Sequence, residues 1–271
     1  MPSSKSILLM VVWAVSMADA IAQPWDANEI DWLLGEPEAR PSRDQRVRLT
    51  PEHFSGVQTD GNFVVPRFQS GDELKLMEAI RANDVAAAQG LLKSGASPNA
   101  QDYWRDSPLL EAVRRDNLEM AMLLIDQGAV VNTKGRGYTA LGLAAKNGNV
   151  QLVSFLLKAG ANPDRKNDDG DTPLHSAVLM GYADTVVALV RAHPDMRLFN
   201  GEGLTPLALA ASTAQYDSAL ALIRGGASLE LGDKKLRPPL WWAFSVGDFD
   251  MARLLLKHGA KPGQLPVQAL N

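Results

Sequence analysis

The sequence contains no cysteine, and it has only four histidines. The lack of cysteine excludes disulfides, thiolate nucleophiles, zinc–thiolate sites and lipid attachment at a cysteine. With so few histidines, histidine-based catalysis or metal binding has few candidate residues. The chain has 27 Lys and Arg against 31 Asp and Glu, a net charge of −4. It therefore lacks the positive excess of a nucleic-acid binder, and we expect no nucleic-acid partner.

Long hydrophobic runs are also scarce. The N-terminal run from Ile7 to Val15 has nine residues, whereas a membrane-spanning helix needs about 20. A lysine precedes this run and small residues follow it, as in a secretory signal peptide. We expect residues 1–22 to be a signal peptide cleaved before Ile21 or Gln23, and the mature protein to be periplasmic with no integral membrane segment. The alternative is a buried N-terminal helix.

The strongest pattern in the chain is a repeat of about 33 residues. A marker of T-P-L type recurs at intervals of 32, 33, 33 and 33 residues, and a Gly-Ala marker recurs in step with it. An aliphatic pair lies 17 residues after each T-P-L-type marker. Counting back one interval places a degenerate sixth unit that opens at Leu74. The T-P-L-type markers are Ser107–Leu109, Thr139–Leu141, Thr172–Leu174, Thr205–Leu207 and Pro238–Leu240.

Each unit has the signals of two short helices. Thr172 is placed to cap a helix and Pro173 suits its first position, while Gly181 suits a left-handed ending. Asn83, Asp116 and Ala214 replace that glycine in other units, and alanine tolerates the left-handed conformation least well. Two short helices cannot bury their apolar faces alone, so neighbouring units must stack into one continuous core.

The segment Gly170 to Ala177 resembles the G-x-T-P-L-H-x-A signature of the ankyrin repeat. The resemblance covers residues 71 to 263 and implies an all-α ankyrin-repeat solenoid of about six helix–turn–helix repeats with short hairpin-like finger loops. In the fourth unit, His193-Pro194 replaces Gly-Ala, so we expect its closing loop to take another shape. The expected repeats are residues 71–101, 102–133, 134–166, 167–199, 200–232 and 233–263.

The segments that flank the repeats have a different composition. Residues 23–70 contain five prolines and no sustained helical period, which indicates an N-terminal arm or cap. Either its Phe63 to Phe68 end covers the first repeat, as terminal repeats require, or Trp25 and Trp32 dock on a partner or on the concave face. Residues 264–271 form a C-terminal tail.

No constellation of catalytic residues is evident. We expect His175 to bond neighbouring repeats, as the resemblance implies, rather than to act in catalysis. The acidic run Asn167 to Asp171 lacks the full calcium-loop pattern and suits a tight turn. Lys234, Lys235 and Arg237 are expected at a solvated loop tip. We therefore expect no cofactor and no metal site.

The resemblance also implies that fingers and inner helices line a concave binding side. Trp104 and Tyr138 stand out, because core packing does not need large aromatic residues at a finger tip and such residues are typical interface anchors. The alternative is that they fold over their own loop or under the arm. Glu111, Arg114, Lys146 and Met180 are expected on the inner-helix face. The candidate partner-binding residues are Tyr103, Trp104, Asp106, Arg115, Arg136, Tyr138, Asp169, Asp171 and Trp242.

These observations predict a non-enzymatic, monomeric protein-binding module that grips another protein. One alternative is an immunity-type protein that neutralises a toxin acting in the periplasm. Less favoured alternatives are an enzyme or metal-binding protein, and a structural spacer in an envelope assembly.

Overall fold

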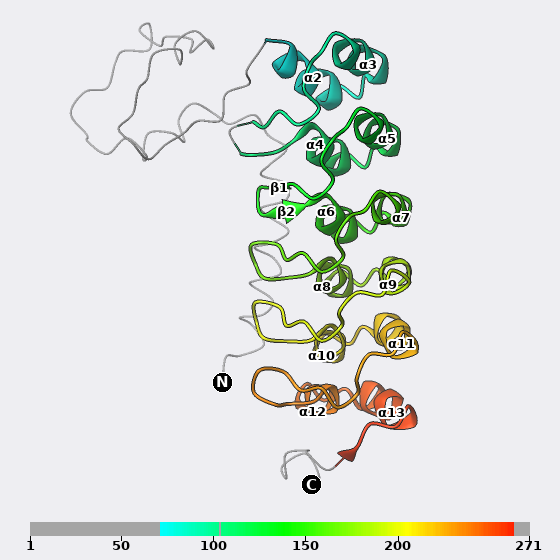
Figure 1. Ribbon diagram of the computed structural model, residues 1–271. Coiled ribbons are helices and arrows are strands. Elements are labelled where there is room, and N and C mark those ends of the chain that lie inside the picture. Colours follow the sequence, from blue (N-terminus) through cyan, green and yellow to red (C-terminus); the bar gives the residue numbers. More distant parts are fainter. Residues whose placement is uncertain (1–70, 103, 263–271) are drawn as a thin grey trace, which may run out of the picture. The chain divides into compact units, whose positions relative to one another are not determined.

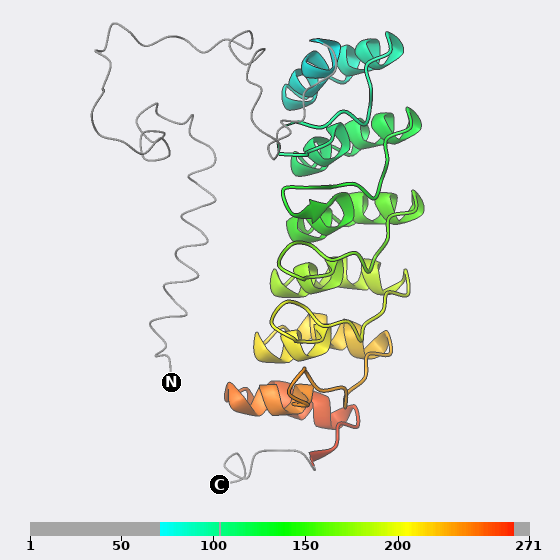
Figure 2. The same ribbon diagram turned by 60° about the vertical axis from the view of Figure 1, so that its left-hand side comes forward.

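A computed structural model describes residues 71–102 and 104–262 of the 271-residue chain. Within this part, twelve helices form six antiparallel pairs that stack in chain order (Figures 1 and 2). The all-α ankyrin-type solenoid predicted from the sequence is thereby confirmed. The pairs are α2 Gly71–Arg81 with α3 Val85–Lys93, α4 Pro108–Arg114 with α5 Leu118–Asp126, α6 Ala140–Asn147 with α7 Val150–Lys158, α8 Pro173–Leu179 with α9 Ala183–Val190, α10 Pro206–Ser212 with α11 Tyr216–Arg224, and α12 Pro239–Ser245 with α13 Phe249–Lys257.

The first helix of a pair begins where the T-P-L-type marker predicts. Thr172 Oγ1 accepts the backbone N–H of His175, and Pro173 occupies the first turn of α8. The proline needs no hydrogen bond there, because that N–H position has no partner inside a helix. Ser107, Thr139 and Thr205 cap α4, α6 and α10 in the same way. Pro238 has no side-chain acceptor, so α12 begins without such a cap.

The turn from the first to the second helix of each pair requires a left-handed residue. Gly148, Gly181 and Gly247 supply it with φ of 74°, 75° and 76°. Asp116 and Ala214 adopt the same conformation with φ of 52° and 56°. The alanine carries a steric cost of about 1–2 kcal/mol, because its Cβ crowds the following carbonyl. The stacking of the pairs therefore fixes this turn even where the residue does not favour it.

The closing loop of the fourth pair departs from the others only locally. His193 has φ of 53°, which is the left-handed conformation of the glycine that it replaces. Pro194 has no N–H, so it cannot make the bond that Ala161 N donates to Leu156 O at 2.9 Å in the preceding pair. The different shape that the sequence predicts is limited to this lost bond and to α9 ending one residue earlier than α7.

The core runs through the whole stack instead of forming one centre. Leu174, Ala177 and Val178 on α8 are buried against Val186 and Leu189 on α9, and each neighbouring pair repeats this pattern. Because every pair buries its apolar faces against the next one, stability is approximately a sum of terms for the pairs and their interfaces.

His175 links the fourth and fifth pairs by hydrogen bonds. Its Nε2–H donates to Leu204 O at 3.0 Å, because a carbonyl oxygen can only accept, and its Nδ1 lies 2.8 Å from Thr172 Oγ1. Burial lowers the pKa of His175 to about 4, so the ring is neutral at physiological pH. The structural role expected for this histidine is therefore the one it has.

The loops before the first helices project to one side of the stack as fingers (Figure 1). An Asp or Asn side chain closes most of them: Asp102 Oδ1 accepts the backbone N–H groups of Trp104 and Asp106, each at 2.9 Å. The finger before α6 has Lys134 in this place and closes by pairing strand β1 Lys134–Gly135 with β2 Tyr138–Thr139. The fingers are thus ordered by their own polar groups.

Several predictions from the sequence lie outside the described residues. They are the signal peptide, the N-terminal arm, the C-terminal tail and the contact proposed for Tyr103.

Candidate functional site

One face of the stack carries most of the predicted partner-binding residues. We call it the finger face, and it is formed by the fingers together with the exposed sides of the first helices. Side-chain contacts join the two: Arg114 of α4 binds Asp106 in the finger before α4, and Lys146 of α6 binds Tyr138 of β2. Side chains from fingers and helices therefore form one surface.

Three carboxylates are buried beneath this surface in the first three pairs. The side chains of Asp102, Asp106 and Glu111 are 8%, 0% and 6% exposed. Asp106 lies 2.9 Å from Arg114 Nη2 and 2.7 Å from Arg136 Nε. Buried carboxylates require such partners, because an unpaired buried charge is very costly.

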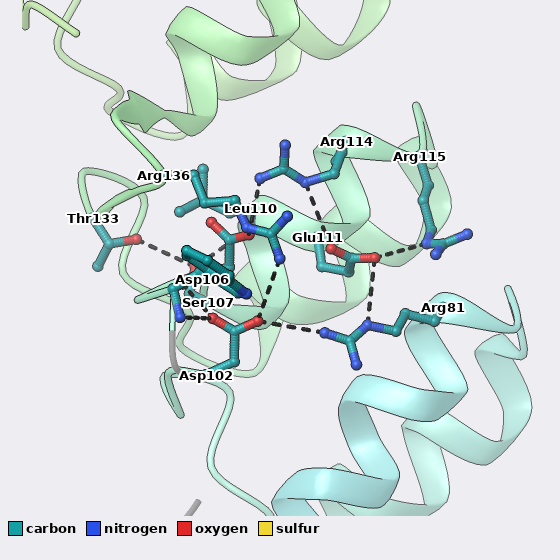
Figure 3. Close-up of polar contacts among 11 residues, drawn as sticks. Arg81, Asp102, Asp106, Ser107, Leu110, Glu111, Arg114, Arg115, Thr133 and Arg136 are labelled. Carbon is teal, nitrogen blue, oxygen red and sulfur yellow. Dashed lines mark hydrogen bonds and ion pairs between the residues drawn. The ribbon is translucent and has the colours of Figure 1, made fainter. Parts of the chain in front are cut away.

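Glu111 holds a second group of arginines. Its Oε1 accepts from Arg115 Nε at 2.9 Å and lies 3.7 Å from Arg81 Nε, while its Oε2 lies 3.6 Å from Arg114 Nε. Arg81 also donates from Nη2 to Asp102 at 3.4 Å. The result is one network of three acids and four arginines that spans α2, α4 and two fingers (Figure 3).

The network arranges its charges in two layers. Burial raises the pKa of Asp106, while Arg114 and Arg136 act in the opposite direction. The four arginine side chains remain 31% to 43% exposed. The acids therefore lie beneath the surface, and the guanidinium groups face outward in fixed positions.

Trp104 is the most exposed aromatic residue of this part of the finger face. It is 57% exposed, and the guanidinium of Arg136 lies 5.3 Å from its ring centroid. The backbone N–H of Arg136 donates to Trp104 O at 3.3 Å, which joins the two fingers. A shallow groove between these fingers is lined by residues that include Trp104, Arg105, Lys134, Arg136, Arg165 and Asp168.

Tyr138 is half-buried and less available than Trp104. Lys146 Nζ donates to its hydroxyl at 2.9 Å and lies 4.7 Å from its ring centroid. The ring also packs against the core. Tyr138 therefore has a structural role alongside any contact with a partner.

The remaining candidates lie on later pairs. Asp169 is exposed and Asp171 is half-buried in the finger before α8, where burial raises the pKa of Asp171. On α12, Trp242 is half-buried beneath Arg237, whose guanidinium lies 4.3 Å from its ring. Its Nε1 is buried without a hydrogen-bond partner among the described residues. These residues do not join the cluster of the first three pairs.

The structure thus sorts the predicted contacts into different roles. Arg115, Arg136, Trp104 and Tyr138 come together on the second and third pairs. Asp106 is a correction: its side chain is fully buried and cannot touch a partner, because two arginines cover it.

Sequence reasoning missed Arg81 and Asp102. Arg81 could have been found, because it precedes Arg114 by one repeat length of 33 residues. Asp102 gives no comparable signal, since its partners come from two other repeats.

Within the described residues, no group of histidine or acidic side chains is placed to hold a metal ion. In the same part of the chain, no helix has the length and apolar character needed to cross a bilayer.

Comparisons with known proteins agree with this architecture. The family model described as "Ankyrin repeats (3 copies)" matches residues 76–167, 131–199 and 185–265. A crystal structure of an ankyrin repeat domain from Acinetobacter baumannii AYE is similar with a TM-score of 0.55 and 34% identity, covering 56% of this chain and 81% of that one.

Two curated relatives show how widely these repeats occur. A putative ankyrin repeat protein of fowlpox virus is 37% identical over 42% of this chain and 35% of its own length. The human transient receptor potential cation channel subfamily A member 1 is 33% identical over 37% of this chain and 9% of its own length. The chain thus spans about a third or less of these relatives. Because the family model covers well over half of the sequence, the chain belongs to the ankyrin-repeat family, whose repeats are protein-binding modules.

Proposed function

We propose that this chain is a non-enzymatic module that binds one partner protein on the finger face, anchored by Trp104 and Tyr138. The observation that carries the proposal is the 57% exposed Trp104 beside Arg136. Exposed tryptophan, tyrosine and arginine are the residues that most often dominate the binding energy of an interface.

The environment of Trp104 supports a binding role. Arg136 is held by Asp106 at 2.7 Å, so its guanidinium is already placed beside the indole before a partner arrives. Ordering side chains on binding costs about 0.5–1.5 kcal/mol each, and a side chain that is already fixed avoids much of this cost. The pair therefore offers an apolar ring and a fixed cation at one point.

We further propose that the module acts in the periplasm after its signal peptide is removed. Support comes from the short apolar run, the lysine before it and the small residues after it. Cell fractionation followed by N-terminal sequencing of the mature protein tests this part. A mature chain that begins at Met1 in the cytoplasm would contradict it.

Capture of the partner from periplasmic extract tests the binding site. Trp104→Ala is expected to weaken capture by at least about 2 kcal/mol while leaving the melting temperature nearly unchanged, because this ring is largely exposed. Phe249→Ala is a matched control, since Phe249 is an aromatic residue on α13 that is 64% exposed.

A second variant tests the other anchor. Tyr138→Ala is expected to weaken capture too, with a modest loss of stability because Tyr138 packs on the core. Unchanged capture by both variants would refute the site. Capture of a toxic enzyme as the partner would favour the immunity-type alternative over a general binding role.

A further inference from the structure

We propose that the first three repeats bind an acidic, extended segment of the partner that carries one acidic residue at every third position. This inference rests on the proposed function and adds the chemistry of the partner. It concerns a basic strip on the finger face that consists of Arg81, Arg114, Arg115, Arg136 and Lys146.

Three members of the basic strip repeat in register. Arg81 on α2, Arg114 on α4 and Lys146 on α6 are 33 and 32 residues apart, so they occupy the same place on three successive first helices. These helices lie one above another in the stack (Figures 1 and 2). The strip therefore presents one cation per repeat along a line.

The buried carboxylates fix the strip instead of cancelling it. They contact the arginines through Nε and Nη2, which leaves the Nη1 amino group of each arginine outside this network. Five cations face three buried acids, an excess of 5 − 3 = 2 positive charges. Counting the exposed Glu78 on α2 still leaves an excess of one. Guanidinium groups held along one edge are well placed to bind carboxylates with the other.

The positive surface ends after the third pair. The places of Arg114 and Lys146 are taken by Leu179 on α8 and Ser212 on α10. Leu179 and its neighbour Met180 are 50% and 46% exposed. A segment that is acidic over the first three repeats therefore meets an apolar patch at the fourth, and we expect an apolar residue to follow its acidic ones.

The spacing of the repeats selects the conformation of the segment. Packed helices are about 8–10 Å apart, so successive cations of the strip are separated by about that distance. A polyproline II chain rises about 3.1 Å per residue with three residues per turn, which places every third side chain on one face about 9 Å apart. A β-strand alternates its faces at every second residue and fits this spacing less well.

Fluorescent peptides test the spacing on the full chain. The probe is a proline-rich peptide of about 12 residues with glutamate at every third position. One control has the same composition with its glutamates adjacent, and another has glutamine for glutamate. By fluorescence anisotropy, the probe is expected to bind about tenfold more tightly than either control and to weaken as salt is raised.

Variants of the strip locate the binding. Lys146→Gln and Arg115→Gln are each expected to weaken the probe about threefold, because both residues are exposed and their loss leaves Asp106 paired. Lys234→Gln is the matched control, since Lys234 is an exposed lysine in the finger before α12. Arg114→Lys retains the charge beside Asp106 and tests the planar group without removing a buried pair.

Three outcomes would overturn the proposal. They are equal binding of the probe and its two controls, equal weakening by Lys234→Gln, and tighter binding of a single-stranded oligonucleotide of equal length through the same residues. Each of these leaves the proposed function standing if Trp104→Ala still abolishes capture of the partner. Loss of that effect instead contradicts the proposed function itself.

Discussion

Neutral His175 makes the stability of the stack depend on pH. Its ring is fully buried, and the pKa falls from 6.5 to about 4 on folding. The folded state therefore binds fewer protons than the unfolded state between these values, and the free energy of unfolding must fall as the pH is lowered through this window. Full stability from this group is present above about pH 6.5.

The size of the effect follows from the two pKa values. At pH 4.5, the linkage relation gives a loss of about 2.5 kcal/mol relative to pH 7.5. His175→Gln removes the titrating group but also disturbs the bonds to Thr172 and Leu204, which costs about 1–3 kcal/mol at pH 7.5. The stability gap between the wild type and the variant should therefore close, or reverse, at acid pH.

Urea unfolding followed by circular dichroism at pH 7.5, 6.5, 5.5 and 4.5 measures this gap directly. Carboxylates also lose stability in acid, but they are common to both proteins and cancel in the difference. Parallel curves for the wild type and His175→Gln across the whole range would refute the assignment of a low pKa to His175.

Urea unfolding also checks three further predictions. Ala214→Gly should stabilise the chain by about 0.5–1 kcal/mol, because φ of 56° strains alanine; no gain would show that the strain is relieved. Gly135→Ala should cost at least about 2 kcal/mol, since an added Cβ would lie 2.5 Å from Arg105 O; wild-type stability would contradict this. Thr185→Val and Ser218→Ala should each gain about 1 kcal/mol, because both hydroxyls are buried without a partner; a loss would reveal a hidden bond.

Local features of the fold could be predicted from the sequence because their causes are local. The cap at Thr172 and the left-handed turn at Gly181 depend on residues within one turn of helix, and both are confirmed. Ala214 shows the limit of such reasoning, since its preference is overridden by the stacking of neighbouring pairs.

The site was harder to predict because its contacts cross repeats. A fingertip aspartate is usually exposed, but Asp106 is buried by Arg114, eight residues later, and by Arg136 from the next finger. Arg81 reaches Asp102 across 21 residues. No local pattern reports that these side chains meet. What the sequence supplies is the 33-residue register, and applying it to charged residues as well as apolar ones would have found the line of Arg81, Arg114 and Lys146.

The same modularity separates binding from stability along the chain. Every contact that fixes the basic strip comes from the first three pairs, whereas His175 and Leu204 join the fourth pair to the fifth. In a stack whose pairs contact only their neighbours, a change in a distant pair alters the total stability without moving the strip. Substitutions in the last pair, such as Phe249→Ala and Lys234→Gln, are therefore informative controls. An effect of either on binding would mean that the partner reaches the sixth repeat, because the described network offers no path for transmitting the change to the third.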